Sequence, residues 1–174
     1  MKKFILLCLI TLGVILQAHS SSAVSLNIKL HPIQSLVVNA DQKEVVLDYQ
    51  TRTDYSSGVT SKQQDHLSIF STGGFEVKVK ANDISLSNDS RTISVADVLV
   101  TPYNGSTPLS NANYTSINLS TVESILLSSD TGGVDKTVSV DYAAKGNYEY
   151  INLYQHTENA NIFKGTVIYT INPK

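Results

Sequence analysis

Apolar and polar side chains alternate with a period of two in several short runs along this chain, which is typical of half-buried β-strands. In the clearest run, residues 75–81, the odd-numbered positions are apolar and the even-numbered positions are charged. A strand directs successive side chains to opposite faces of its sheet. We therefore expect Val77 and Val79 to face the core, with Lys78 and Lys80 in solvent.

Turn-forming residues separate these runs, because glycine and asparagine supply the positive φ that tight hairpins need. The turn signals are Ser57-Gly58, Thr72-Gly73-Gly74, Asn104-Gly105, Thr131-Gly132-Gly133 and Lys145-Gly146-Asn147. The expected strands are 25–30, 34–38, 43–50, 66–71, 74–81, 91–100, 115–119, 122–128, 136–143, 148–154 and 163–172. Such a series predicts an all-β domain, an immunoglobulin-like antiparallel β-sandwich, with a closed β-barrel as the alternative.

The first 23 residues have the three parts of a secretory signal peptide. Lys2 and Lys3 precede an apolar run from Phe4 to Leu16, and a short stretch rich in serine follows that run. The run is too short to cross a bilayer as a helix, since a span needs about 20 apolar residues. We expect cleavage after Ala23, with Ala18 as the alternative, which makes residues 24–174 a single exported domain without a membrane span. The location would be the periplasm, the cell surface or the medium.

The charge balance argues against a nucleic-acid partner. Removal of Lys2 and Lys3 with the signal would leave 11 of the 13 basic residues against 15 acidic ones, a formal charge of −4. Binding to nucleic acid requires clustered lysine and arginine, and no such cluster is present. The one cysteine, Cys8, lies inside the apolar run and would leave with the signal. The stability of the exported domain must then come from its core rather than from disulfides.

No pattern in the chain indicates catalysis, a metal or a cofactor. His31, His66 and His156 fall in different expected elements, and none has a second ligand at metal-binding spacing. The acidic turn from Asp130 to Asp135 does not match the spacing of a calcium-binding loop and is interpreted as an ordinary turn. The chain has no G-x-S-x-G nucleophile elbow either. We expect no cofactor and no metal site.

A row of tyrosines is the candidate contact surface. In a strand over 148–154, one face would carry Tyr148, Tyr150, Asn152 and Tyr154. If the other face packs on the core, the exposed tyrosines provide apolar area and hydroxyl groups for a sugar or a protein. In the alternative, the tyrosines line the core and Glu149 is exposed.

Three segments carry a resemblance to known proteins: SLNIKLHPIQSLVVN, HLSIFSTGGFEVKVK and GTVIYTI. Their arrangement resembles small secreted β-sandwich proteins of Bacteroidetes and, more distantly, bacterial pilin-like and surface-coat subunits. In pilin-like families the N-terminal strand of one subunit completes the sheet of the next. The resemblance implies that Leu26, Ile28 and Leu30 form such an assembly strand, although this chain lacks the cysteine pair of chaperone–usher pilins. The strand could instead pair within its own subunit.

These observations lead to three hypotheses about function. The first is a non-enzymatic envelope or surface protein, an adhesin-like or filament-type structural subunit whose partner is a copy of itself or another envelope protein. The second is a carbohydrate-binding module that uses the tyrosine row to hold a polysaccharide. The third is a hydrolase whose catalytic carboxylates meet only in the folded protein.

Overall fold

A computed structural model describes residues 21–154 and 160–174 of the chain. The chain divides into two units, residues 1–30 and residues 31–174, and only residues 21–30 of the first unit are described. Most of the expected signal peptide, residues 1–20, therefore lies outside the described residues, as does His156. None of the described helices has the length and apolar character needed to cross a membrane.

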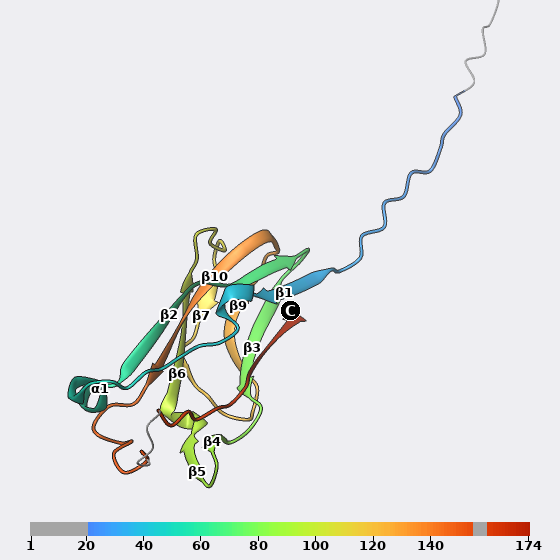
Figure 1. Ribbon diagram of the computed structural model, residues 1–174. Coiled ribbons are helices and arrows are strands. Elements are labelled where there is room, and N and C mark those ends of the chain that lie inside the picture. The colour runs from blue at the N-terminus through green and yellow to red at the C-terminus, as the bar shows by residue number, and fades with distance from the viewer. Residues whose placement is uncertain (1–20, 155–159) are drawn as a thin grey trace, which may run out of the picture. The chain divides into compact units, whose positions relative to one another are not determined.

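The unit of residues 31–174 is built almost entirely of strands (Figure 1). The strands are β1 (Gln34–Val38), β2 (Val59–Ser71), β3 (Phe75–Ala81), β4 (Ser85–Asn88), β5 (Arg91–Ser94), β6 (Val98–Asn104), β7 (Asn113–Tyr114), β8 (Ile117–Asn118), β9 (Ser124–Ser129), β10 (Gly133–Ala144) and β11 (Val167–Pro173). The helical elements are the 3-10 turns η1 (Ala40–Gln42) and η2 (Val95–Asp97) and the short helix α1 (Arg52–Ser57).

Two antiparallel sheets form this unit. The first sheet has the strand order β1-β2-β10-β6-β8, and the second has the order β11-β3-β9-β7. A separate hairpin pairs β4 with β5. The sheets meet along one side at β1 and β11, so the C-terminus lies near β1 (Figure 1). The all-β sandwich expected from the sequence is confirmed.

The core lies between the two sheets and follows the alternation of the strands. Phe75, Val77 and Val79 of β3 are 0–1% exposed, and the intervening charged residues of that strand are only partly buried. Leu67 of β2 and Val140 of β10 meet them from the first sheet, both fully buried. Burial of side chains of this size contributes about 1.5–3 kcal/mol each, which makes this layer the main source of stability.

The helix α1 forms where the sequence supplies both caps. The side chain of Thr51 accepts a hydrogen bond from the backbone N–H of Asp54, and Asp54 accepts from the N–H of Thr51, so the two residues form a capping box. The hydrogen bond that the Asp54 carboxylate accepts from the backbone of Thr51 is the main cause of the lowered pKa of this carboxyl. Gly58 ends the helix with a φ of 83°, a conformation that glycine adopts without strain.

Three expected strands are not formed. Residues 25–30, 43–50 and 148–154 have no strand in the structure, whereas β1, β3, β9, β10 and β11 lie close to their expected positions. Val45 and Leu47 do pack against the core, but their segment has no ladder partner. The expected strand 91–100 is interrupted by η2, and β2 begins seven residues earlier than expected.

Candidate functional site

The segment Val24–Leu30, called segment 24–30 below, shows its alternating apolar side chains to solvent. Val24, Leu26, Ile28 and Leu30 are 80–92% exposed. Single exposed apolar residues are common on protein surfaces, but a row of four at alternate positions is not. Leu26, Ile28 and Leu30, the residues expected to form an assembly strand, therefore lie outside any strand in the described residues and have exposed side chains.

The edge strand β11 offers backbone groups to a further strand. Asn82 N donates to Thr166 O at 2.9 Å, and Lys174 N donates to Gly74 O at 3.0 Å. In an antiparallel ladder the hydrogen-bonded residues alternate. With Val167 opposite Ala81, this alternation directs the N–H and C=O groups of Val167, Tyr169 and Ile171 away from β3, to the side on which no strand pairs with β11.

The same three residues of β11 turn their side chains toward the core without being fully buried. Val167, Tyr169 and Ile171 pack against the core cluster and remain partly exposed. Leu36 and Val38 do the same on β1, the neighbouring edge of the first sheet. The seam between the two sheets is therefore apolar and incompletely covered along both edge strands.

Open edges of this kind are usually protected by charged residues or by short length. The other edge of each sheet follows this rule, since β7 and β8 have two residues each. In contrast, β11 has seven residues and β1 has five, and neither contains a charged residue. Among the described strands, β11 is thus the longest edge available for pairing.

The tyrosine row expected over 148–154 is not formed. The chain makes turns there, with positive φ at Asn147, Tyr148 and Asn152. Its backbone lies alongside the end of α1 and donates hydrogen bonds to it. Tyr148 N donates to Tyr55 O at 2.7 Å, for example. Tyr150 is buried, with 8% of its surface exposed, whereas Tyr148 and Tyr154 are 41% and 50% exposed. Tyr148, Tyr150, Asn152 and Tyr154 therefore do not share one strand face.

Tyr150 instead belongs to an aromatic cluster at the end of the sandwich near α1. Its ring meets the ring of Tyr49 edge to face, with centroids 5.2 Å apart, and Tyr55 lies against the other side of the cluster at 5.3 Å from Tyr49. Burial raises the pKa of Tyr150 to about 12 and that of Tyr49 further still. These hydroxyls therefore stay protonated at physiological pH.

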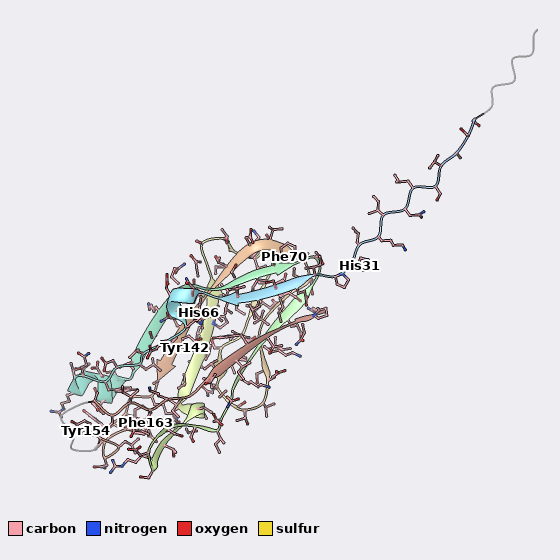
Figure 2. The ribbon with its side chains drawn as sticks, turned by 45° about the vertical axis from the view of Figure 1, so that its right-hand side comes forward. His31, His66, Phe70, Tyr142, Tyr154 and Phe163 are labelled. Atoms are coloured by element: carbon pink, nitrogen blue, oxygen red, sulfur yellow. The ribbon has the colours of Figure 1, made fainter. Side chains whose placement is uncertain are left out.

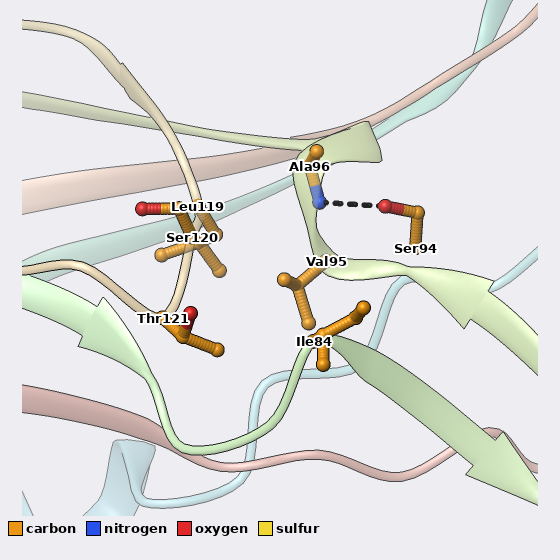
Figure 3. A pocket seen from close by; sticks show the side chains of 7 residues that line it. All are labelled: Ile84, Ser94, Val95, Ala96, Leu119, Ser120 and Thr121. Carbon is orange, nitrogen blue, oxygen red and sulfur yellow. Dashed lines mark hydrogen bonds between the residues drawn. The ribbon is translucent and has the colours of Figure 1, made fainter.

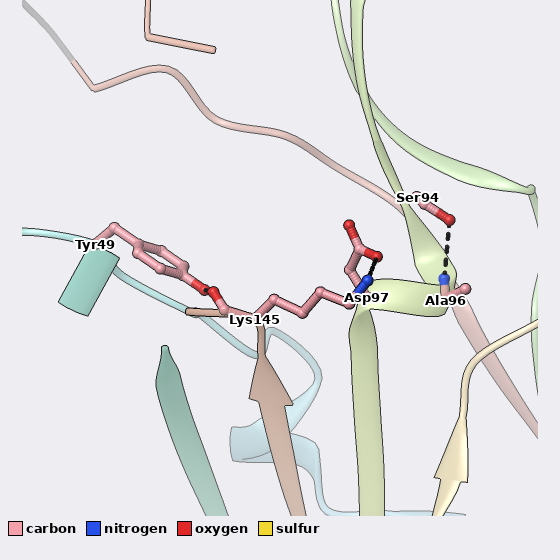
Figure 4. A network of polar contacts seen from close by, with 5 residues as sticks. All are labelled: Tyr49, Ser94, Ala96, Asp97 and Lys145. Carbon is pink, nitrogen blue, oxygen red and sulfur yellow. Dashed lines mark hydrogen bonds and ion pairs between the residues drawn. The ribbon is translucent and has the colours of Figure 1, made fainter. Parts of the chain in front are cut away.

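A polar network joins this cluster to η2 (Figure 4). The hydroxyl of Tyr49 donates to Lys145 O at 2.6 Å, and Lys145 Nζ lies 2.5 Å from Asp97 Oδ1. The hydrogen bond to Asp97 raises the pKa of Lys145. Ser94 accepts a hydrogen bond from Ala96 N at the start of η2. The network fixes the end of β10 against η2, and the ammonium group of Lys145 is held in an ion pair with Asp97.

A small pocket opens beside the same turn (Figure 3). Its volume is about 180 Å³, and its lining comes from the end of β5, η2, the residue before β4 and the chain after β8. Val95 and Leu119 form an apolar floor, and the hydroxyl-bearing residues Ser94, Ser120 and Thr121 line the remainder together with Ile84 and Ala96. The pocket contains no acid, base or metal-ligand cluster.

The two described histidines do not meet. His31 is exposed, and His66 is 2% exposed in a hydrogen-bonded position (Figure 2). Within residues 21–154 and 160–174, no group of three histidine, cysteine or acidic side chains is arranged to hold a metal ion.

Sequence reasoning missed the burial of His66, because alternation with Leu67 and Ile69 would place it outward. The register between β2 and β10 shifts between Val138 and Val140, and Asp65 has a φ of 52°. At this bulge both His66 and Leu67 are buried. A bulge of this kind leaves no reliable signal in the sequence.

Comparison of the chain with protein-family models and with curated proteins finds no match.

Proposed function

We propose that this chain is a non-enzymatic exported subunit of a filament or surface layer, and that it assembles by adding segment 24–30 as a strand to β11 of another copy. The observation that carries the proposal is the row of four alternate apolar side chains, 80–92% exposed. An extended segment that adds to a sheet edge gains main-chain hydrogen bonds, and its alternate side chains enter apolar positions.

The dimensions of segment 24–30 and of β11 agree. Segment 24–30 and β11 each contain seven residues, and each directs alternate apolar side chains to one side. The outward backbone groups of Val167, Tyr169 and Ile171 could therefore pair with the added strand while its apolar residues cover the half-buried seam. Pro32 cannot donate to a ladder, which favours a strand that ends before it.

The energies involved are large enough to support assembly. Each apolar side chain of this size contributes about 1.5–3 kcal/mol when fully buried. Each new main-chain hydrogen bond adds about 1 kcal/mol. The cost of association is estimated at about 4–15 kcal/mol. The favourable free energy from four side chains and several hydrogen bonds is of the same size.

The test compares two neighbouring substitutions in the exported form, residues 24–174. Ile28→Asp places a charge in the apolar row, whereas Asn27→Asp places the same charge on the other side of the segment. Light scattering after size-exclusion chromatography should show polymers for the unmodified chain and for Asn27→Asp, and monomers for Ile28→Asp. Circular dichroism should show the same fold in all three. An unmodified chain that stays monomeric at every concentration would refute the proposal, as would equal assembly of both variants.

The carbohydrate-binding alternative has less support. It depended on a continuous tyrosine row, and Tyr150 is buried between its exposed neighbours Tyr148 and Tyr154. Retention of the protein on insoluble polysaccharides, lost in a Tyr148→Ala, Tyr154→Ala double variant, would favour this alternative over assembly.

A further inference from the structure

A chain of buried hydrogen bonds connects the two sheets through His66, called the His66 relay below. Its members are Gln42 of η1, His66 of β2, Tyr142 of β10 and Tyr169 of β11. His66 Nδ1 lies 3.0 Å from Gln42 Oε1, and His66 Nε2 lies 2.9 Å from the Tyr142 hydroxyl. The Tyr142 hydroxyl in turn bonds to that of Tyr169. Figure 2 shows His66 and Tyr142 close together.

The direction of every hydrogen bond in the relay follows from its first member. Gln42 Nε2 donates to Gln64 O at 2.8 Å, so Gln42 Oε1 faces His66 and must accept. His66 therefore carries its proton on Nδ1, and its Nε2 accepts from the hydroxyl of Tyr142. Because that hydroxyl proton is used, Tyr169 must be the donor to Tyr142. All protons point the same way, from β11 toward β2.

A second proton on His66 is incompatible with this arrangement. Nε2 would become a donor, so the Tyr142 hydroxyl would have to accept from it and donate to the hydroxyl of Tyr169, which leaves the Tyr169 proton without its acceptor. The side chains that hydrogen-bond to the His66 imidazole or stack against it carry no negative charge that could offset the new positive charge. Gln42 is uncharged, and the rings of Tyr142 and Tyr169 meet the imidazole edge to face, with centroids at 5.6 and 5.9 Å.

The carboxylate next to His66 in the sequence is engaged elsewhere. Asp65 precedes His66, but its Oδ1 accepts from Ser106 N at 2.7 Å. Hydrogen bonds from Ser106 and Thr137 lower the pKa of Asp65. Its charge is therefore stabilised by the loop after β6 rather than by His66.

We propose that the His66 relay is an acid-sensitive link between β11 and the first sheet: protonation of His66 reverses the hydrogen-bond chain, removes the acceptor of the Tyr169 hydroxyl and loosens β11. The link concerns one subunit and does not depend on the assembly proposed above. Tyr169 is the β11 member of the relay, so the loss of its acceptor acts on an edge strand that pairs on only one side. Local opening of such a strand requires less free energy than global unfolding.

The pH range follows from the burial of His66, which lowers its pKa from 6.5. The unfolded or locally opened chain then binds the proton more readily than the closed one. The stabilisation of the closed state by neutral His66 is complete above about pH 6.5 and is lost progressively as the pH falls below that value. At pH 5 the equilibrium constant for opening can rise by at most about thirtyfold. This limit applies to a histidine whose pKa is 6.5 in the open state and which stays neutral in the closed state.

Hydrogen exchange measured by NMR tests this link in the Ile28→Asp form of residues 24–174, which should not polymerise. The amides of Ile168, Thr170 and Asn172 bond to β3 and report on β11. Between pH 7.5 and pH 5, after correction for intrinsic rates, their protection should fall at least threefold more than that of Val140 in β10. His66→Gln should remove this difference, and Tyr169→Phe should lower β11 protection already at pH 7.5.

Two results would overturn the proposal. One is an equal change in protection for β11 and β10, and the other is a β11 change that persists in His66→Gln. If His66→Gln fails to fold, the imidazole resonances of the unmodified His66 decide directly. Titration of His66 at or above pH 6.5 would contradict the relay, whereas titration below 6.5 together with selective opening of β11 supports it.

Discussion

At the scale of single residues, Val79 shows how closely the second sheet depends on the alternation of β3. It is 1% exposed and lies between Ser124 of β9 and Tyr169 of β11. Its neighbour Lys80 points to the other face, where it forms a 3.3 Å ion pair with Glu123. The expected orientation of β3, with valines inward and lysines outward, is confirmed.

Val79→Asp should unfold the domain, and Lys80→Asp should not. A buried aspartate without a partner costs on the order of 4 kcal/mol or more, a large part of the total stability of a domain of this size. Loss of the surface pair of Lys80 costs at most about 1 kcal/mol. Urea denaturation followed by circular dichroism measures both. Similar midpoints for the two variants would mean that the register of β3 is wrong.

Burial of individual residues was predictable where the strands are regular and not where the backbone departs from the pleat. His66 and Tyr150 are the two informative failures. A bulge at Asp65 turns His66 inward, and turns at Tyr148 and Asn152 move Tyr150 out of the expected row into contact with Tyr49. In both cases the tertiary structure selects a positive φ at a residue other than glycine, which no alternation pattern reports.

At the scale of elements, the helix α1 is fixed to the end of β10 through a close backbone contact. A Cβ atom on Gly58 would lie 2.4 Å from Ala144 O, and the φ of Gly58 is 83°. Gly73 is a suitable comparison, because a Cβ atom there would meet nothing within 4 Å and its φ is not positive.

Gly58→Ala should destabilise the protein by about 1–3 kcal/mol, because alanine is strained at this φ and collides with β10. Gly73→Ala should change the stability by no more than about 1 kcal/mol, in either direction. Thermal unfolding of the two variants under the same conditions gives the comparison. A Gly58→Ala protein as stable as the unmodified one would show that α1 does not pack against β10 as described.

Two of the strands that were expected but not formed, 25–30 and 43–50, share a cause. Alternation reports which side of a segment meets the core, and it does not report whether another backbone lies alongside. Val45 and Leu47 pack on the core from a segment without a ladder, and Leu26 and Ile28 alternate in a segment that forms no strand. At Val45 and Leu47 the sequence pattern was therefore correct for the side chains and insufficient for pairing.

At the scale of the whole molecule, the two sheets meet along one side through long edge strands. The sheets end there in β1 and β11, which are uncharged, longer than the opposite edges and only partly covered. The sequence predicted the sandwich and the apolar character of segment 24–30. It did not predict which edge is open, because the strand order depends on pairings between residues far apart in the chain.

The central claim is that segment 24–30 of one copy pairs with β11 of another, and binding of that segment as a peptide tests it most directly. A chain of residues 31–174 is titrated with a peptide of residues 24–30, followed by NMR, and a peptide carrying Ile28→Asp is the control. We predict that the amides of Val167, Tyr169 and Ile171 shift and become protected from exchange, and that the thermal midpoint rises. Changes centred on β7 or β8, or equal effects of the two peptides, would contradict the account.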